Sequence, residues 1–504
     1  MRSTLFPADT DLRHLGVLVG NPDADRIIAV STSAVFQDSS LLQTYWGRDG
    51  TVIDGGFQGH MYTRPTDVQV VRVPANGDDV PRMVLTATAV NRDIWSSRTG
   101  IKLAPATGQI VMASDQSPPR SLPANVTWHR GSLLEAAAGR FRDHGEALLA
   151  FVPDTRLAEL LSAAEQGCEA LMKQAASTSR LMDKNVAMQV LQDNGVDCAR
   201  TYAVDEHIAL SHVLGRIPES GRYVFKPAGG AAGIGLYGHR GGAPLDHIRA
   251  HIDGLTRSGR LPRRFQVQEF LPGTPYGVTA YFRGHGSFDI LEVHRQVIDD
   301  AGRFMGGRWT PALQEEQMPA AHALCTQLAA IEQPALAGLV CLDFLCAKVI
   351  EVNPRLTASA PIAHLLQRED RIAHHLGRGF RIGQIDLNGR VRIPYESVRS
   401  GKLRDFTHEA WRESGVLALP QGINPFGDSR LVFVNDHGET AQRIFVERIA
   451  EQRRLFRLRG GERDPPVDVN VPRIPTLHAP VGGRVDAEVA GPLEEVDSLV
   501  PLGP

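Results

Sequence analysis

The sequence lacks several features that would assign it to a specialised class of protein. It has no run of 18 apolar residues, so no transmembrane helix is expected. Its opening residues contain no apolar stretch typical of a secretory signal. The 504 residues include only five cysteines, without a CxxC pair, which argues against a disulfide framework and against structural zinc. These absences favour a reducing, cytoplasmic setting.

Charge is nearly balanced, with 54 Lys plus Arg against 57 Asp plus Glu. A net charge of −3 argues against a nucleic-acid surface covering the whole chain, although a local basic groove remains open. Only six of the basic residues are lysines. A lysine in such a chain is favoured where a compact point charge is needed, although GC-rich coding would give the same bias.

A chain of this length suggests about three domains at roughly 150 residues each. Residues 1–180 mix short apolar strands with helical patterns and predict an α/β domain. Its expected strands are 16–20, 26–30, 68–73, 83–90 and 147–153, and its expected helices begin at 132 and 154. Residues 181–395 hold nearly all the chemical signals. Residues 396–459 predict a small α/β domain, and the proline-rich tail 460–504 is expected to be extended or disordered.

A strand carrying Lys226 runs into a loop with four glycines at 229, 230, 233 and 235. Glycines let successive backbone N–H groups curl around an anion, and Lys226 would reach its oxygens. No helix start follows the loop, which disfavours a dinucleotide fingerprint. A flexible hairpin with a surface lysine remains the alternative. Upstream, residues 179–194 predict a helix with Lys184 in its first turn, where a solvated lysine is the ordinary interpretation.

Two carboxylates define the most informative segment, LVCLDFLCAKVIEVNPR at 339–355. A three-residue loop at 346–348 would place Asp343 opposite Glu351, where like charges repel. A hard divalent cation resolves that repulsion, and Asn353 adds an oxygen of the type magnesium prefers. The alternative is that one acid is protonated, or paired with Lys348 or Arg355.

Between these motifs, residues 265–271 read as a strand entering a Pro–Gly turn. Such a strand end can offer backbone N–H and C=O groups to an adenine edge. The strand at 290–296 carries Arg295, which could hold a substrate carboxylate or a terminal phosphate, and Glu292 and His294, which could line an acceptor site.

In this order the parts resemble the ATP-grasp superfamily of carboxylate–amine ligases over residues 181–365. The resemblance implies an α+β grasp that binds ATP and Mg²⁺. ATP contacts are implied for Lys184, Lys226, Gly229, Gly230, Gly233, Gly235, Gln268, Glu269 and Leu271. Magnesium ligands are implied for Asp343, Glu351 and Asn353. Arg355 is implied at the transferring phosphate and acyl group. Arg295, from the strand at 290–296, is the second catalytic candidate. The sequence departs from many members at Thr274–Gly277, where no acidic residue is available for the ribose.

The resemblance implies amide formation through an acyl phosphate, with release of ADP and phosphate. The expected partners are a small carboxylic acid and an amino acid or peptide amine, with no nucleic acid and no membrane; a homodimer remains open. An α/β domain before the grasp resembles bacterial peptide ligases of natural-product biosynthesis, of the pheganomycin-ligase type. A non-catalytic nucleotide-binding protein and a kinase on the same fold are the alternatives.

Overall fold

The computed structural model describes residues 180–354 with gaps at 206–209, 229–234, 285, 299–301, 303, 333–335 and 337. It also describes residue 357, a few positions between 117 and 135, and the short strands named below. The expected strand 83–90, the helix at 154 and the tail 460–504 lie outside the described residues, as does all but Glu135 of the helical pattern from 132. No helix in the described part of the chain is long and apolar enough to cross a bilayer.

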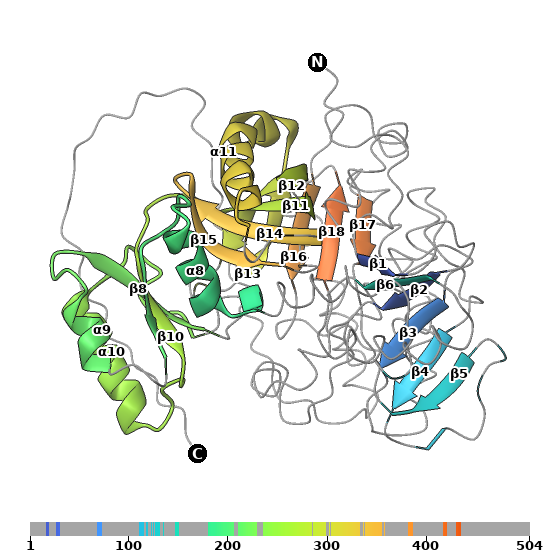
Figure 1. The fold of residues 1–504 in the computed structure, drawn as a ribbon, viewed down its shortest axis with the longest axis horizontal. Helices are drawn as coiled ribbons and strands as arrows, with labels where there is room; N and C mark the ends of the chain where they lie inside the picture. Colours follow the sequence, from blue (N-terminus) through green and yellow to red (C-terminus); the bar gives the residue numbers. More distant parts are fainter. Residues whose placement is uncertain are drawn as a thin grey trace, which may run out of the picture. The chain divides into compact units, whose positions relative to one another are not determined.

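The N-terminal segment contains a six-stranded sheet in the order β1-β6-β2-β3-β4-β5 (Figure 1). Four of the expected strands are present, and β4 and β5 are additional to them. All neighbours are parallel except β1 and β6, as the alternating α/β pattern predicts. The strands are β1 (Val17–Val19), β2 (Ile27–Val30), β3 (Val68–Arg72), β4 (Ile110–Ser114), β5 (Val126–Arg130) and β6 (Ala147–Ala150).

A four-stranded antiparallel sheet follows, in the order β7-β10-β8-β9. Its strands are β7 (Thr201–Val204), β8 (Arg222–Pro227), β9 (Ala243–Pro244) and β10 (Phe265–Glu269). One face buries Phe225 and Phe265 in an apolar cluster shared with the helices α9 (Leu210–Gly215) and α10 (Leu245–Arg257). Side chains alternate along a strand, so Lys226 and Gln266 lie on the other face.

An eight-stranded sheet, antiparallel throughout, has the order β15-β14-β11-β12-β13-β16-β18-β17. β17 and β18 come from residues 396–459, so these two strands extend the sheet of the central segment. The strands are β11 (Tyr276–Gly284), β12 (Ser287–Ile298), β13 (Phe304–Trp309), β14 (Gly338–Leu345), β15 (Lys348–Asn353), β16 (Ile382–Asp386), β17 (Leu417–Pro420) and β18 (Arg430–Val434).

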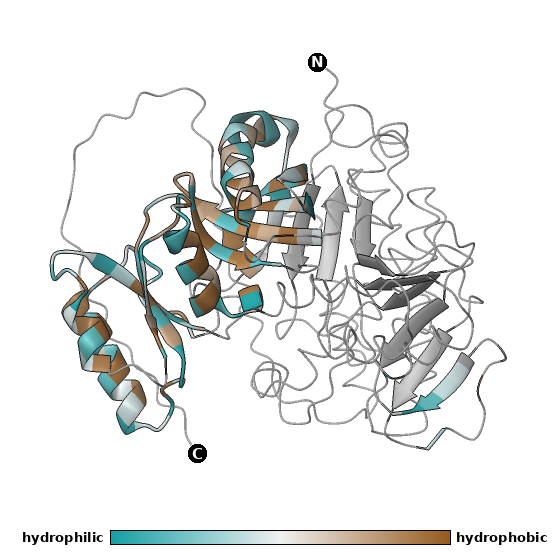
Figure 2. Ribbon diagram, viewed as in Figure 1, coloured by the Kyte–Doolittle hydropathy of each residue, from teal (hydrophilic) through white to brown (hydrophobic). Residues whose placement is uncertain are grey.

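Two helices bury the apolar side chains of this sheet. The helix α11 (Pro311–Ala329) packs against β11 and β12, and α8 (Lys184–Asp193) packs beside β15. Both contribute to one core cluster with strand residues such as Val278 and Phe344. Figure 2 shows hydrophobic and hydrophilic residues alternating along α11, and also along α10, which packs against β8 and β9 of the four-stranded sheet. The helix predicted over 179–194 is confirmed as α8. It is capped by Asn194 and followed by Gly195 in the left-handed conformation.

The β14–β15 hairpin is tighter than the sequence predicts. Its turn has two residues, Cys346 and Ala347, both at positive φ (50° and 56°), and Leu345 pairs with Lys348. Such a turn matches the right-handed twist of the strands. A bulge after Asp343 then restores the predicted pairing of Asp343 with Glu351. The three-residue loop was wrong, but the facing acids are confirmed.

Candidate active site

The paired acids lie in a row of polar positions that crosses the sheet. Glu351 is opposite Asp343, Asp343 is opposite Gly277, and Gly277 is opposite His294. Gly277 is needed because a Cβ at this position would lie 2.3 Å from the His294 ring. Antiparallel partners project from the same face, so one face of the sheet presents both acids and the imidazole.

The two acids differ in charge although they face each other. Burial, and then the carboxylate of Glu351, raise the pKa of Asp343 to about 7. Burial acts in the same direction on Glu351, but Lys184 and Lys226 outweigh it and hold the pKa of Glu351 below its usual value. The pair therefore carries one firm negative charge and one that titrates near neutrality.

Lys184 and Lys226 reach the acids from two other elements. Lys184, in the first turn of α8, lies 3.1 Å from Glu351 Oε2, and the two side chains are only 14% and 20% exposed. Lys226, on β8, is 8% exposed, and its Nζ donates to the Ile350 carbonyl at 3.4 Å. Burial lowers the pKa of Lys226 to about 8, against the opposing pull of Glu351. The solvated interpretation of both lysines is therefore wrong.

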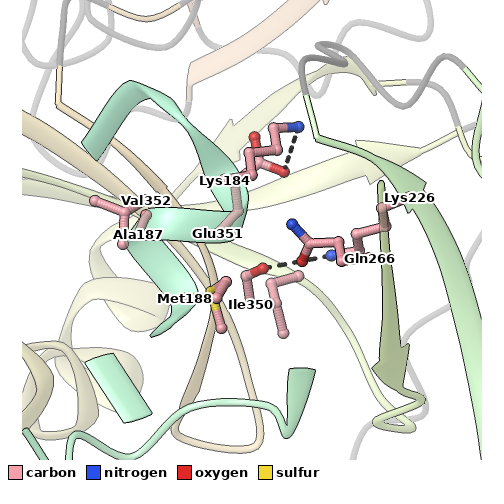
Figure 3. Close-up of a pocket in the computed structure, with 8 residues that line it drawn as sticks. All are labelled: Lys184, Ala187, Met188, Lys226, Gln266, Ile350, Glu351 and Val352. Carbon is pink, nitrogen blue, oxygen red and sulfur yellow. Dashed lines mark hydrogen bonds and ion pairs between the residues drawn. The ribbon is translucent and has the colours of Figure 1, made fainter. Parts of the chain in front are cut away.

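Lys184, Lys226 and Glu351 line one pocket between the two sheets (Figure 3). Its wall includes Gln266, which sequence reasoning missed. The strand period gave the signal, because Gln266 lies two residues before Gln268 and therefore on the same face. The lining residues are Lys184, Ala187, Met188, Lys226, Gln266, Ile350, Glu351 and Val352.

An internal network holds the polar row in place. Glu292, which is fully buried, accepts a hydrogen bond from Thr279 and is hydrogen-bonded to His294 Nδ1 at 3.0 Å. Burial lowers and Glu292 raises the pKa of His294, and the net shift is upward. Gln296, on the same strand, donates to Asp343 Oδ1 at 2.6 Å. Sequence reasoning also missed Gln296, although it follows His294 at the same strand period.

Arg295, predicted as a second catalytic residue, is not brought to the acids of the hairpin. It pairs with Tyr276, whose ring stacks on Phe344 in the core cluster. Neighbouring strand residues project to opposite faces, so Arg295 lies on the face away from Asp343. Arg355, Gly229, Gly230 and Gly233 lie outside the described residues. Gly235 is described at φ +77°, where a Cβ would meet Pro227.

The strand that was predicted to hold adenine faces the same inter-sheet space. Gln268 donates to Thr201 Oγ1 at 3.0 Å and to the Ile350 carbonyl at 3.3 Å. The Glu269 N–H donates to the Arg200 carbonyl, and its carboxylate accepts from Lys348 at 3.4 Å. Lys348 therefore pairs with Glu269, not with either acid of the hairpin. Leu271 follows in the turn before Gly273.

The donor set suits magnesium better than zinc. Asp343, Glu351 and the amide of Asn353, which donates to Glu351 Oε1 at 3.2 Å, provide hard oxygen ligands. In the part of the chain that is described, no three His, Cys, Asp or Glu side chains converge as a complete metal cage. Two carboxylates with an amide fit an ion that takes its remaining ligands from water and phosphate.

Residues 181–359 match the family described as the ATP-grasp domain. Similar solved structures include N5-carboxyaminoimidazole ribonucleotide synthetase from Thermus thermophilus (15% identity, TM-score 0.42, 79% of this chain and 100% of that one). Others are an L-amino acid ligase from Bacillus licheniformis (13%, 0.42, 77% and 98%) and a biotin carboxylase from Campylobacter jejuni (13%, 0.41, 72% and 86%). Likeness at this level does not carry a function from those proteins to this one. The comparison with curated proteins found no match.

Proposed function

We propose that the chain, whose residues 181–359 match the ATP-grasp domain family, is an ATP-dependent carboxylate–amine ligase. It would join a small carboxylic acid to an amino acid or peptide amine through an acyl phosphate, with release of ADP and phosphate. A role in bacterial natural-product biosynthesis is part of the proposal.

The observation that supports it best is the convergence of two lysines on the paired acids. Lys184, Lys226 and Glu351 line one pocket, and Asp343 is the strand partner of Glu351. They come from a helix, from the small sheet and from the large sheet. Phosphoryl transfer requires positioning and charge neutralisation more than a protein nucleophile. The pocket offers both.

Each residue has a role that its position supports. Lys184 and Lys226 would bind phosphate oxygens of ATP, with the glycines at 229–235 covering them. Asp343, Glu351 and Asn353 would hold Mg²⁺, which when bound offsets the charge of the phosphates. Gln296 would keep Asp343 oriented through the 2.6 Å hydrogen bond. Arg355 stays the predicted contact of the transferring phosphate.

Adenine would lie along β10 and the turn that follows it. The Glu269 N–H is already used by Arg200, so the Glu269 carbonyl and the Leu271 N–H are the groups we assign to the base. Gln268 would support this edge through its bonds to Thr201 and Ile350.

The test is an ADP-release screen over pairs of carboxylic acids and amines, run with ATP and Mg²⁺ on the full chain. A ligase gives ADP only when both an acid and an amine are present, with the amide detected by mass spectrometry. Glu351→Gln should lose this activity by at least a hundredfold while still folding to a protein that unfolds in one cooperative transition. Gln189→Glu, at an exposed position on α8, is the matched control and should keep full activity.

Other outcomes would contradict the proposal in distinguishable ways. Phosphate transfer to a stable acceptor without an amine would indicate a kinase. ATP binding without product from any pair would favour the non-catalytic nucleotide-binding protein. Release of AMP and pyrophosphate would indicate an adenylating enzyme. Normal turnover by Glu351→Gln would refute the metal assignment.

A further inference from the structure

Gln266 is a buried polar side chain whose hydrogen-bonding capacity is unused. It is 1% exposed, and neither its Nε2 nor its Oε1 has a hydrogen-bond partner in the described part of the chain. Most buried side-chain polar atoms in folded proteins have at least one partner. A carboxamide left without any partner reduces stability, so its presence calls for an explanation.

The neighbouring glutamine on the same strand shows the ordinary solution. Gln268, which is 2% exposed, bonds to Thr201 Oγ1 and to the Ile350 carbonyl. The two side chains project from one face of β10, yet only Gln268 is satisfied by the protein. Packing against the large sheet therefore accounts for Gln268 and leaves Gln266 unexplained.

The surroundings of Gln266 hold more hydrogen-bond donors than the acceptors beside them can occupy. It is the strand partner of Lys226, and it shares the pocket with Lys184 (Figure 3). The two ammonium groups carry six N–H donors. Their hydrogen bonds in the described structure go to Glu351 Oε2 and the Ile350 carbonyl. The amide of Gln266 adds two more donors, so the pocket is complementary to a group with many acceptor oxygens.

We infer that Gln266 binds the phosphate chain of the nucleotide, its Nε2 donating to a phosphate oxygen next to the one held by Lys226. Its Oε1 then accepts from the Lys226 ammonium, whose three donors exceed the single acceptor it now has. This inference rests on the proposed function and adds to it a phosphate-binding residue that the sequence motifs do not mark.

The experiment measures the affinity of the full chain for three ligands by isothermal titration calorimetry: ATP with Mg²⁺, tripolyphosphate and adenosine. Gln266→Leu should weaken ATP and tripolyphosphate about tenfold, or about 1.4 kcal/mol. Its affinity for adenosine should be unchanged. The melting temperature of the ligand-free variant should equal or exceed that of the wild type, because no protein hydrogen bond is lost.

Gln268→Leu is the matched control, since it removes the same group from the same face of β10. It should lower the melting temperature of the ligand-free protein, because two hydrogen bonds are broken. Should Gln266→Leu fail to fold, the same titrations on Gln266→Glu test whether residue 266 contacts phosphate. It keeps the shape of the side chain, and its negative charge should weaken tripolyphosphate binding more than tenfold.

Equal affinities of wild type and Gln266→Leu for both phosphate ligands would overturn this inference and leave the proposed function intact. Loss of adenosine affinity with unchanged tripolyphosphate affinity would also overturn it, because the contact would then be to the nucleoside. A wild-type protein that binds neither ATP nor tripolyphosphate would overturn the proposed function itself.

Discussion

Lys226 offers the sharpest test of the electrostatics of the pocket, because function and stability should respond in opposite directions. Its ammonium is buried on β8 with one hydrogen bond, to the Ile350 carbonyl at 3.4 Å. Burial lowers its pKa from 10.5 to about 8. At 1.36 kcal/mol per pKa unit, holding that charge in the folded protein costs about 3 kcal/mol. Lys226→Met removes the charge and keeps the length of the side chain.

We expect Lys226→Met to raise the free energy of unfolding of the ligand-free protein at pH 7 by up to about 3 kcal/mol. The gain falls short of this ceiling because Glu351 loses part of its positive surroundings. The same variant should bind ATP at least tenfold more weakly, since a hydrogen bond to a charged group is worth about 1.5–3 kcal/mol. Urea unfolding and titration calorimetry on one preparation measure both effects.

The pH dependence of the unfolding free energy supplies a second check. The folded-state pKa of Lys226 is below its unfolded value, so between about pH 8 and 10.5 the unfolded chain binds more protons. The wild type therefore gains stability as pH rises through this window, and its difference from Lys226→Met shrinks. A variant less stable than the wild type at pH 7, or a difference that does not change between pH 7 and 9.5, would refute the assignment of a buried, charged Lys226.

Three further predictions concern Asp343, Gly277 and the protonation of Lys226. Since the pKa of Asp343 is raised to about 7 in the folded protein, the metal-free wild type should lose stability relative to Asp343→Asn as the pH rises from about 4 to 7. A melting-temperature difference between the two proteins that stays constant over this range would contradict it. Gly277→Ala should cost about 1–3 kcal/mol, because its Cβ would overlap the His294 ring, whereas Gly254→Ala, a helical position with open space, should stabilise slightly. ATP binding at pH 8.5 should take up protons through Lys226, so the measured heat should vary with the ionisation enthalpy of the buffer; uncorrected heats that are the same in every buffer would argue against it.

Local features of the site could be predicted because they depend on few residues. Asp343 and Glu351 are separated by one tight turn, and the period of two along each strand fixes which side chains face each other. The turn itself was harder to predict, since Cys346 and Ala347 adopt positive φ without the Asn or Gly that usually marks such a turn. The bulge that compensates for the shorter turn leaves no trace in the residue pattern.

Arg295 shows where strand periodicity stops being informative. The period of two says that Arg295 and Gln296 project from opposite faces, but it does not say which face meets the pocket. That choice is made by α11, which covers the face that carries Tyr276 and Phe344. With that face buried, Gln296 reaches Asp343 and Arg295 does not.

The residue pattern was enough to predict the facing acids, a helix over 179–194 with Lys184 in its first turn, and the lysine before the glycine loop, since each depends on neighbours close along the chain. Only the packing of the tertiary structure shows that Lys184 pairs with Glu351, 167 positions away, and that Gln266 projects beside Lys226 with no hydrogen-bond partner among the described residues. Contacts of that kind depend on how separately formed layers pack on one another. The pairing of a charge across two layers is set by burial and distance in space, which no spacing along a strand or helix encodes.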